Sequence, residues 1–427
     1  LNNKQREAAT HMNGPLLVVA GAGAGKTKTI THRILNLIKN GVAPEKILAV
    51  TFTNKAAKEM KERIDLEIQR SLSRFDLDIG ETPFVSTFHS LGVYIIKENA
   101  RVLGLTRHFT ILDESDSRTL IKEAIKEIGL DPKQYDPKKI GNIISREKGK
   151  FIHLADYEEI ANGPGAGYLS KIVAQVWSLY EKKKAKENSL DFDDLLLKAT
   201  KLLKENEKIR KIYQEKWDYI HVDEYQDTNE VQCLMSRLLS ENNKNICVVG
   251  DADQNIYSWR GANLKNILSF EKDYPNAKII LLEENYRSTK NILEAANKVI
   301  KKNKYRPDKN LFTKNIVGEK IGLYEALDEN DEADFVETKV LEILDKGVDV
   351  SWWGVSQADG PRDSDHAETA SAPLSDIAIL YRANFQSRAL EEAMLRYNIP
   401  YQVLGVKFFE RKEIKDTLAY LRAALNP

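Results

Sequence analysis

A glycine-rich segment near the start of the chain restricts the fold more than any other feature. Residues 20–27 read Ala-Gly-Ala-Gly-Ala-Gly-Lys-Thr and follow directly after an apolar run at 16–19. Glycine permits positive φ and close approach, so the backbone N–H groups of residues 21–25 can wrap around phosphate groups. Lys26 would then reach the β- and γ-phosphate oxygens, and Thr27 would offer a hydroxyl to Mg²⁺. The pattern predicts a strand, a phosphate-binding loop and a helix, with the ligand held by Ala22, Gly23, Ala24, Gly25, Lys26 and Thr27.

A pair of carboxylates supplies the second half of such a site. The apolar run at 219–222 leads directly into Asp223 and Glu224. An acidic pair after a strand is usually a solvated loop, but beside a phosphate-binding loop it suits catalysis. Asp223 would hold Mg²⁺ directly or through water, while Glu224 would orient and deprotonate the attacking water. The two segments together predict hydrolysis of a nucleoside triphosphate.

The composition excludes several classes of protein. Of the 427 residues, 42% are hydrophobic and 30% charged, which is ordinary for a soluble globular chain. No apolar stretch approaches the roughly 20 residues needed to cross a bilayer, so we expect no membrane partner. The only cysteines, Cys233 and Cys247, lack metal-type spacing and fit a reducing cytosol, in bacteria the cytoplasm or nucleoid. Because residue 1 is Leu rather than Met, the lack of a signal peptide has little weight.

The charge balance leaves nucleic acid as an open partner. The chain carries 64 basic and 64 acidic residues, which argues against a globally basic coat but leaves room for a local phosphate-binding groove. Two basic clusters stand out, and each is better interpreted as solvated surface charge. They are Lys138, Lys139, Arg146, Lys148 and Lys150, and Lys301, Lys302, Lys304, Arg306 and Lys309.

Short apolar runs alternate with helical patterns over much of the chain. The runs at 16–20, 47–52, 84–87, 219–222, 246–250, 279–282 and 377–381 predict buried strands. Helical periodicity at 27–40, 54–70 and 289–303 lies between several of them, so we expect a parallel α/β sheet with helices on both faces. Between about 90 and 190 long charged helices dominate, which indicates a helical insertion. Residues 348–373 are polar and non-periodic and predict an exposed insertion or linker.

Three longer motifs carry a family resemblance. Asp223-Glu224-Tyr225-Gln226-Asp227-Thr228, the run from Val249 to Gly261, and Glu284-Asn285-Tyr286-Arg287-Ser288-Thr289 stand in this order. The chain resembles the UvrD/PcrA/Rep group of superfamily 1 DNA helicases from its first residue almost to its last, interrupted at 348–373. The resemblance implies a first RecA-like P-loop NTPase domain at 1–90 and 190–282, with a helical subdomain inserted at 91–189. It further implies an incomplete second RecA-like domain at 283–385 and the start of another helical subdomain at 386–427.

The resemblance also implies roles for residues around ATP. Gln5 would hydrogen-bond the adenine and Tyr286 would stack on it, although a helix cap and a buried core tyrosine are their ordinary alternatives. Lys28 stands where close relatives have an arginine that packs on the base, and a lysine stacks poorly. Gln254 would sense the γ-phosphate, and Arg260 and Arg287 would be cations that offset the negative charge on the transferred phosphoryl group.

A second set of residues suits single-stranded DNA. Hydroxyl and amide groups bind phosphates without reading sequence, and aromatic rings stack on any base. By the resemblance, the DNA groove would be lined by Phe52, Asn54, Thr87, His89, Phe192, Tyr257 and Trp259. The carboxylates that flank Phe192 would repel phosphate, so contact there must come from the ring face. Trp259 lies five residues after Gln254, which offers a direct route from ATP state to DNA grip.

These features together predict a motor that uses ATP and Mg²⁺. We expect ATP to bind between two α/β domains and to drive translocation on single-stranded DNA with strand separation at junctions with duplex, in repair or replication. The family resemblance implies that the polarity is 3′→5′. The family's later motifs have no counterpart before Pro427, so we expect this chain to bind ATP but to hydrolyse weakly and not to unwind. Two alternatives stay open: a subunit of a RecB/AddA-type helicase-nuclease, and a regulatory module that binds ATP and single strands without catalysis.

Overall fold

The computed structural model describes residues 1–75, 82–303, 309–346, 374–403 and 417. The chain divides into two compact units, Leu1–Lys320 and Ile321–Pro427, which are described separately. Among the described residues, no helix combines the length and the apolar character that a membrane span requires.

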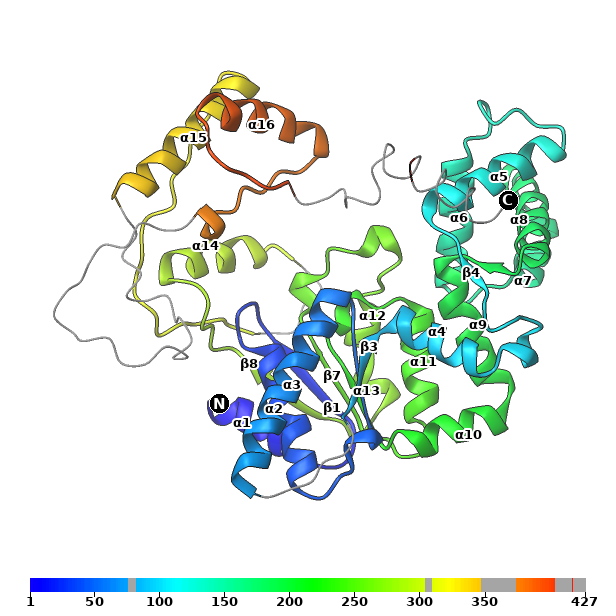
Figure 1. The fold of residues 1–427 in the computed structure, drawn as a ribbon, viewed down its shortest axis with the longest axis horizontal. Coiled ribbons are helices and arrows are strands. Elements are labelled where there is room, and N and C mark those ends of the chain that lie inside the picture. The colour runs from blue at the N-terminus through cyan, green and yellow to red at the C-terminus, as the bar shows by residue number, and fades with distance from the viewer. Residues whose placement is uncertain (76–81, 304–308, 347–373, 404–416, 418–427) are drawn as a thin grey trace. The chain divides into compact units, whose positions relative to one another are not determined.

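A six-stranded parallel sheet forms the centre of the first unit (Figure 1). Its strands are β1 (Leu16–Ala20), β2 (Ile47–Thr51), β3 (Phe84–Thr87), β6 (Tyr219–Val222), β7 (Ile246–Gly250) and β8 (Lys278–Leu282). Their order is β3-β2-β6-β7-β1-β8, and every pairing is parallel. The predicted α/β class is confirmed, and six of the seven predicted strands lie within a residue of their expected bounds.

Each face of the sheet is buried by its own group of helices. Alternate side chains of a strand point to opposite faces, so Leu16 and Val18 enter one core while Leu17 and Val19 enter the other. The helices on the first face are α1 (Asn3–Thr10), α2 (Lys26–Lys39) and α3 (Asn54–Phe75). The second face is covered by α4 (Phe88–Glu98), α9 (Phe192–Glu205), α10 (Glu207–Lys216), α11 (Glu230–Ser240), α12 (Lys265–Leu268) and α13 (Phe270–Asp273). Burial on both faces explains why the central strands read as continuous apolar runs.

The stretch between α4 and α9 is mainly helical, as predicted for residues of about 90–190. Its helices are α5 (Glu114–Glu127), α6 (Pro137–Gly149), α7 (Leu154–Asn162) and α8 (Tyr168–Lys186), and they enclose a separate core around Trp177. A short parallel pair that was not predicted, β4 (Thr110–Ile111) and β5 (Ser189–Leu190), joins the two ends of this insertion. The pair brings the chain back to the sheet domain immediately before α9.

The chain leaves the sheet through α14 (Lys290–Ile300), and the second unit contains α15 (Glu329–Lys346) and α16 (Ser387–Arg396). These two helices pack together through Val340 and Met394. The predicted strand at 377–381 is wrong: this segment has no strand pairing and Leu380 is 93% exposed. An apolar run becomes a strand only where another strand accepts its hydrogen bonds, and the described part of this unit has none. The predicted insertion at 348–373 lies outside the described residues.

Candidate functional site

Strand order assembles the candidate site. The four segments predicted to hold a nucleotide follow β1, β6, β7 and β8, which are consecutive across the sheet. Ligands of parallel α/β sheets bind beyond the carboxyl ends of the strands, where these segments meet. The segments after β2 and β3, predicted to contact DNA, lie along the same edge on the far side of β6. One edge of the sheet therefore carries both sets of predicted residues.

The loop after β1 has the backbone that phosphate binding needs. Gly23 and Gly25 adopt φ of 66° and 77°, and Gly25 directly precedes α2. A Cβ on Gly23 would lie 2.7 Å from both Asn285 Nδ2 and Arg287 Cβ, so only glycine permits this approach. The loop thus presents the N-terminus of a 14-residue helix, whose free N–H groups and dipole favour an anion.

Lys26 brings the loop and the acidic pair together. Its Nζ lies 3.2 Å from Glu224 Oε2 and donates a hydrogen bond of 3.1 Å to Gln254 Oε1. Glu224 has φ of 51° and ψ of 44°, a conformation that few residues other than glycine adopt and that clusters at functional sites. Three segments far apart in sequence therefore converge on one ammonium group.

A magnesium ion would fit beside this group. The Thr27 hydroxyl donates to Asp223 Oδ2 over 3.4 Å, and Asp223 is 4% exposed. Burial and the neighbouring Glu224 carboxylate raise the pKa of Asp223 to about 6, against the opposing effect of Lys26. The hydroxyl is half-buried, and the other oxygen of the buried carboxylate accepts from the Glu224 N–H at 2.9 Å. Hydroxyl and carboxylate oxygens are the hard donors that Mg²⁺ prefers.

Gln226, which sequence reasoning passed over as a contact, closes a ring of polar side chains. Its Nε2 donates to Glu224 Oε2 at 2.8 Å, and its Oε1 accepts from the backbone N–H of Asp251 at 2.9 Å. Asp251 Oδ2 in turn accepts from Gln254 Nε2 at 2.7 Å, and Gln254 returns to Lys26. The ring links the segments after β1, β6 and β7 through buried or half-buried groups.

Residues after β8 approach the loop from the other side. Asn285 Nδ2 donates to the Ala22 carbonyl at 2.7 Å, and the Tyr286 N–H donates to the Gly23 carbonyl at 2.9 Å. Arg287 is exposed, and its guanidinium has no ion pair among the described residues. It is free to meet a phosphate. The side chain of Arg260 lies outside the described residues.

The predicted base-binding residues meet at α1. Gln5 is 3% exposed; its Nε2 donates to the Ala24 carbonyl at 2.9 Å and its Oε1 accepts from the Asn2 N–H at 2.9 Å. It therefore caps α1 and holds the phosphate loop. Asn2 Nδ2 also donates to the Tyr286 hydroxyl at 2.8 Å, which links the two predicted base contacts. The capping pattern Asn-x-x-Gln was the available signal for Asn2. Lys28 is exposed beside them.

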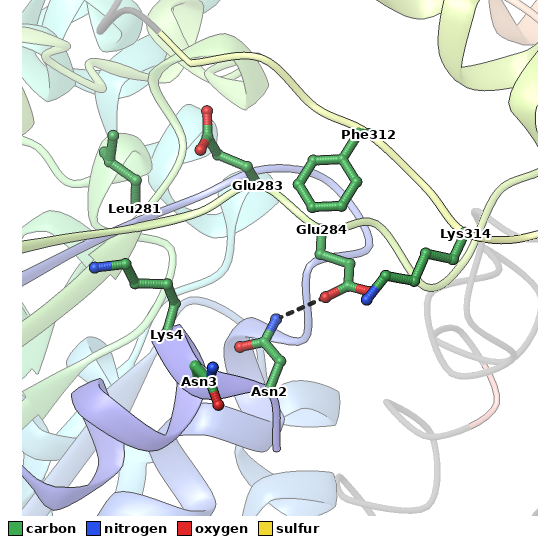
Figure 2. Close-up of a pocket in the computed structure, with 8 residues that line it drawn as sticks. All are labelled: Asn2, Asn3, Lys4, Leu281, Glu283, Glu284, Phe312 and Lys314. Carbon is green, nitrogen blue, oxygen red and sulfur yellow. Dashed lines mark hydrogen bonds and ion pairs between the residues drawn. The ribbon is translucent and has the colours of Figure 1, made fainter.

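A pocket opens next to these residues (Figure 2). Its floor includes Glu284, whose Oε2 accepts from Asn2 Nδ2 at 3.1 Å and whose Oε1 lies 2.9 Å from Lys314 Nζ. The complete lining consists of Asn2, Asn3, Lys4, Leu281, Glu283, Glu284, Phe312 and Lys314. Tyr286, 48% exposed, has its hydroxyl fixed and much of its surface open to a planar ligand.

Two groups of aromatic rings lie along the rest of the edge. Phe52 stacks on Tyr257 with centroids 5.0 Å apart, and Tyr257 lies 6.5 Å from Trp259, which is 73% exposed. His89 and Phe192 form an edge contact of 5.6 Å. Burial lowers the pKa of His89 to about 4, so this ring is neutral at pH 7.

The two remaining predicted DNA contacts, Asn54 and Thr87, differ in how exposed their side chains are. Asn54 is exposed at the start of α3. Thr87 is 4% exposed, and its hydroxyl accepts from the Ser90 N–H at 3.2 Å as the cap of α4. A DNA role for each stays a prediction.

Two lysines expected on the surface are buried. Lys148 is 2% exposed and Lys309 is 5% exposed. Lys309 pairs with Asp251 and lies 3.1 Å from Asp253 Oδ2. For these two, the interpretation as solvated surface charge is wrong, because carboxylates distant in sequence pair with them.

Comparison with known proteins agrees with this geometry. Residues 1–275 match the UvrD/REP helicase N-terminal domain, and residues 280–427 match the UvrD-like helicase C-terminal domain. The ATP-dependent DNA helicase PcrA of Bacillus subtilis (strain 168) is 46% identical over 100% of this chain and 53% of its own length. Those of Leuconostoc citreum and Staphylococcus aureus (strain Mu50 / ATCC 700699) are 44% identical over 100% of this chain and 53% and 54% of their lengths. The chain thus spans about half the length of these curated relatives. It belongs to the UvrD/REP helicase family.

Proposed function

We propose that this chain binds ATP with Mg²⁺ and single-stranded DNA on one edge of its sheet, and couples the two as a DNA helicase. The observation that carries the proposal is the convergence of Glu224 and Gln254 on Lys26. A triphosphate that takes Lys26 would leave both side chains facing its terminal phosphate. The 3′→5′ polarity and the action at junctions rest on the family resemblance.

Six side chains at the site have a chemical role in this proposal. Lys26 and Arg287 offset the negative charge on the transferred phosphoryl group. Glu224 accepts the proton of the attacking water and fixes its direction. Thr27 and Asp223 would hold Mg²⁺, which when bound supplies charge stabilisation at the phosphates. When a triphosphate binds, Gln254 would give up its hydrogen bond to Lys26 and contact the terminal phosphate instead. The position of Gln254 would then depend on whether that phosphate is present.

The coupling to DNA follows from chain continuity. Gln254 and Tyr257 are three residues apart, and Tyr257 stacks on Phe52 at the end of β2. A shift of Gln254 toward a phosphate would therefore move a ring that contacts the DNA side. Exposed rings such as Trp259 can stack on any base, which suits a motor that must grip every sequence.

Steady-state ATP hydrolysis with and without oligo-dT tests the proposal. We expect weak hydrolysis that oligo-dT stimulates, and loss of this turnover in Glu224→Gln with ATP affinity retained. Strong DNA-stimulated turnover would refute the expectation that this chain hydrolyses weakly. Glu215→Gln, at an exposed glutamate on α10, is the matched control. Equal turnover of the Glu224→Gln variant and the native chain would refute the catalytic assignment. If neither chain turned over ATP while both bound it and oligo-dT, a binding module would be the better description.

A further inference from the structure

Five charged side chains form a buried ion cluster away from the nucleotide site. The cluster consists of Lys148 on α6, Glu181 and Lys184 on α8, Asp191, and Asp194 on α9. The side chains of its two lysines are 1% and 2% exposed. The cluster therefore joins two helices of the insertion to the first turn of α9, a helix that packs on the sheet.

The two aspartates form the cap of α9. Asp191 Oδ1 accepts from the Asp194 N–H at 2.8 Å, and Asp194 Oδ2 accepts from the Asp191 N–H at 3.1 Å. Capping of this reciprocal kind fixes the start of a helix. Phe192 and the half-buried Asp193 are the two residues between them. Phe192 is 54% exposed, so the cap determines where its ring stands.

The lysines neutralise these same aspartates. Lys148 Nζ lies 2.8 Å from both Asp191 Oδ2 and Asp194 Oδ1. Lys184 Nζ lies 2.9 Å from Asp191 Oδ2 and also pairs with Asp194. The Tyr180 hydroxyl donates to Asp191 Oδ2 at 3.0 Å. All four carboxylate oxygens of Asp191 and Asp194 thus accept from donors, and the two lysines that supply most of these contacts also pair with Glu181.

This pairing reduces an obstacle to DNA binding at Phe192, although the Asp193 carboxylate is not part of it. Two unpaired carboxylates beside an exposed ring would repel the phosphates on either side of a stacked base. In a buried site such charges are poorly screened, so their effect would extend to the surface. The third acid of the cluster, Glu181, accepts from Trp177 Nε1 at 3.1 Å on the insertion and does not adjoin the ring.

We propose that Lys148 and Lys184 are positioning residues for single-stranded DNA, which neutralise the cap of α9 so that Phe192 can stack on a base. The inference rests on the proposed function, because it requires that DNA reach Phe192. It adds that the insertion contributes to DNA affinity through buried charge, without touching the strand.

Two double variants test the proposal at constant cluster charge. Lys184→Met with Asp194→Asn removes a lysine and an acid near Phe192. It leaves Lys148 to pair with Asp191 and with the more distant Glu181. Lys184→Met with Glu181→Gln removes the same total charge but leaves both aspartates to share one lysine. Each variant keeps the native cluster's excess of one carboxylate, so it avoids the additional unpaired charge that makes removal of one partner of a buried pair so destabilising.

The measurement is binding of fluorescent oligo-dT by anisotropy over a range of salt concentrations. We expect the first double variant to bind within about twofold of the native chain. The second should bind about 5- to 100-fold more weakly, the range of losing one stacked base. ATP affinity should be unchanged in both, which also reports folding. Lys183→Met, at a neighbouring lysine paired with Glu123 and Glu127, is the control.

Each outcome is decisive. Equal DNA affinity of the two double variants, both folded, would overturn the positioning role of the lysines. Weaker binding by the first variant than by the second would do the same, because the order is set by the charge beside Phe192. Failure of the native chain itself to bind oligo-dT would instead refute the proposed function. If the second variant did not fold, Phe192→Ala, which leaves the cluster intact, should reproduce the expected loss, and native affinity of that variant would refute the inference.

Discussion

Gly92 stands inside α4 at the point where this helix crosses α9, and its replacement by alanine gives a sharp test of the structure. A Cβ built on Gly92 would lie 2.3 Å from the carbonyl oxygen of Leu195 and 3.0 Å from its carbonyl carbon. Both atoms are helix backbone and cannot rotate away as a side chain would. Carbon and oxygen in close contact lie about 3.3 Å apart, so the helices would have to separate by about 1 Å.

The expected size of the effect follows from two opposing contributions. Forcing an extra methyl group into a packed core destabilises by about 1–3 kcal/mol. Alanine in place of glycine inside a helix stabilises by about 1 kcal/mol. Because a backbone carbonyl takes the contact, we expect the upper part of the first range and a net loss of about 1–2 kcal/mol for Gly92→Ala. Separation of α4 from α9 should also part His89 from Phe192 and weaken oligo-dT binding.

Urea unfolding followed by circular dichroism measures this loss, with Gly141→Ala as the matched control. Gly141 lies inside α6, where a Cβ would meet only the flexible Ile121 Cδ1 at 3.2 Å. We expect the control to be neutral or more stable than the native chain. A Gly92→Ala chain as stable as Gly141→Ala would refute the packing of α4 on α9.

Three further predictions concern single side chains. Burial lowers the pKa of His221 to about 3, so the folded chain keeps it neutral while the unfolded chain protonates it below about 6.5. The free energy of unfolding of the native chain, relative to that of His221→Leu, should fall by about 1.4 kcal/mol for each pH unit as the pH is lowered from 6 to 4, and should stay constant above pH 7.5. Urea unfolding measures both chains, and parallel pH profiles of the two would contradict this prediction. Asp223→Asn should require at least about tenfold more Mg²⁺ for ATP hydrolysis, measured by magnesium titration, because it loses an anionic ligand; an unchanged titration would remove Asp223 from the metal site. Trp259→Ala should weaken oligo-dT binding by about 1–3 kcal/mol at unchanged ATP affinity, with partial recovery in Trp259→Phe; equal loss in both would show that stacking is not its role.

The sequence predicted those parts of the molecule whose signal is local. A buried parallel strand shows as a continuous apolar run, and the phosphate loop shows as glycines before Lys26, so both could be placed to within a residue. The parallel pair β4–β5 has only two residues in each strand, too few for any period. The run at 377–381 has the same composition as a core strand, and only the lack of a partner strand among the described residues distinguishes it.

The contacts that the sequence did not predict depend on pairing between residues that are distant in the chain. Lys148 stands in a basic stretch that indicates a surface, and its partners Asp191 and Asp194 follow more than forty positions later. Gln226 was visible within a motif, but its contact with the Asp251 backbone depends on β6 lying beside β7. Gln5 was expected to read a base, and the structure adds that it also holds the loop. Such contacts are consequences of topology and leave no pattern in a single sequence.

Strand order also explains why one short segment can serve both ligands. β7 lies between β6 and β1, while β2 lies on the far side of β6. The chain that leaves β7 must therefore pass the end of β6, where Asp223 and Glu224 stand, before Tyr257 reaches Phe52. Any rearrangement at Gln254 acts on a segment that is fixed to the ring of polar groups at one end and to the aromatic pair at the other. A chain with β2 and β6 exchanged would keep every motif and lose this connection, so coupling is a property of the sheet as much as of its residues.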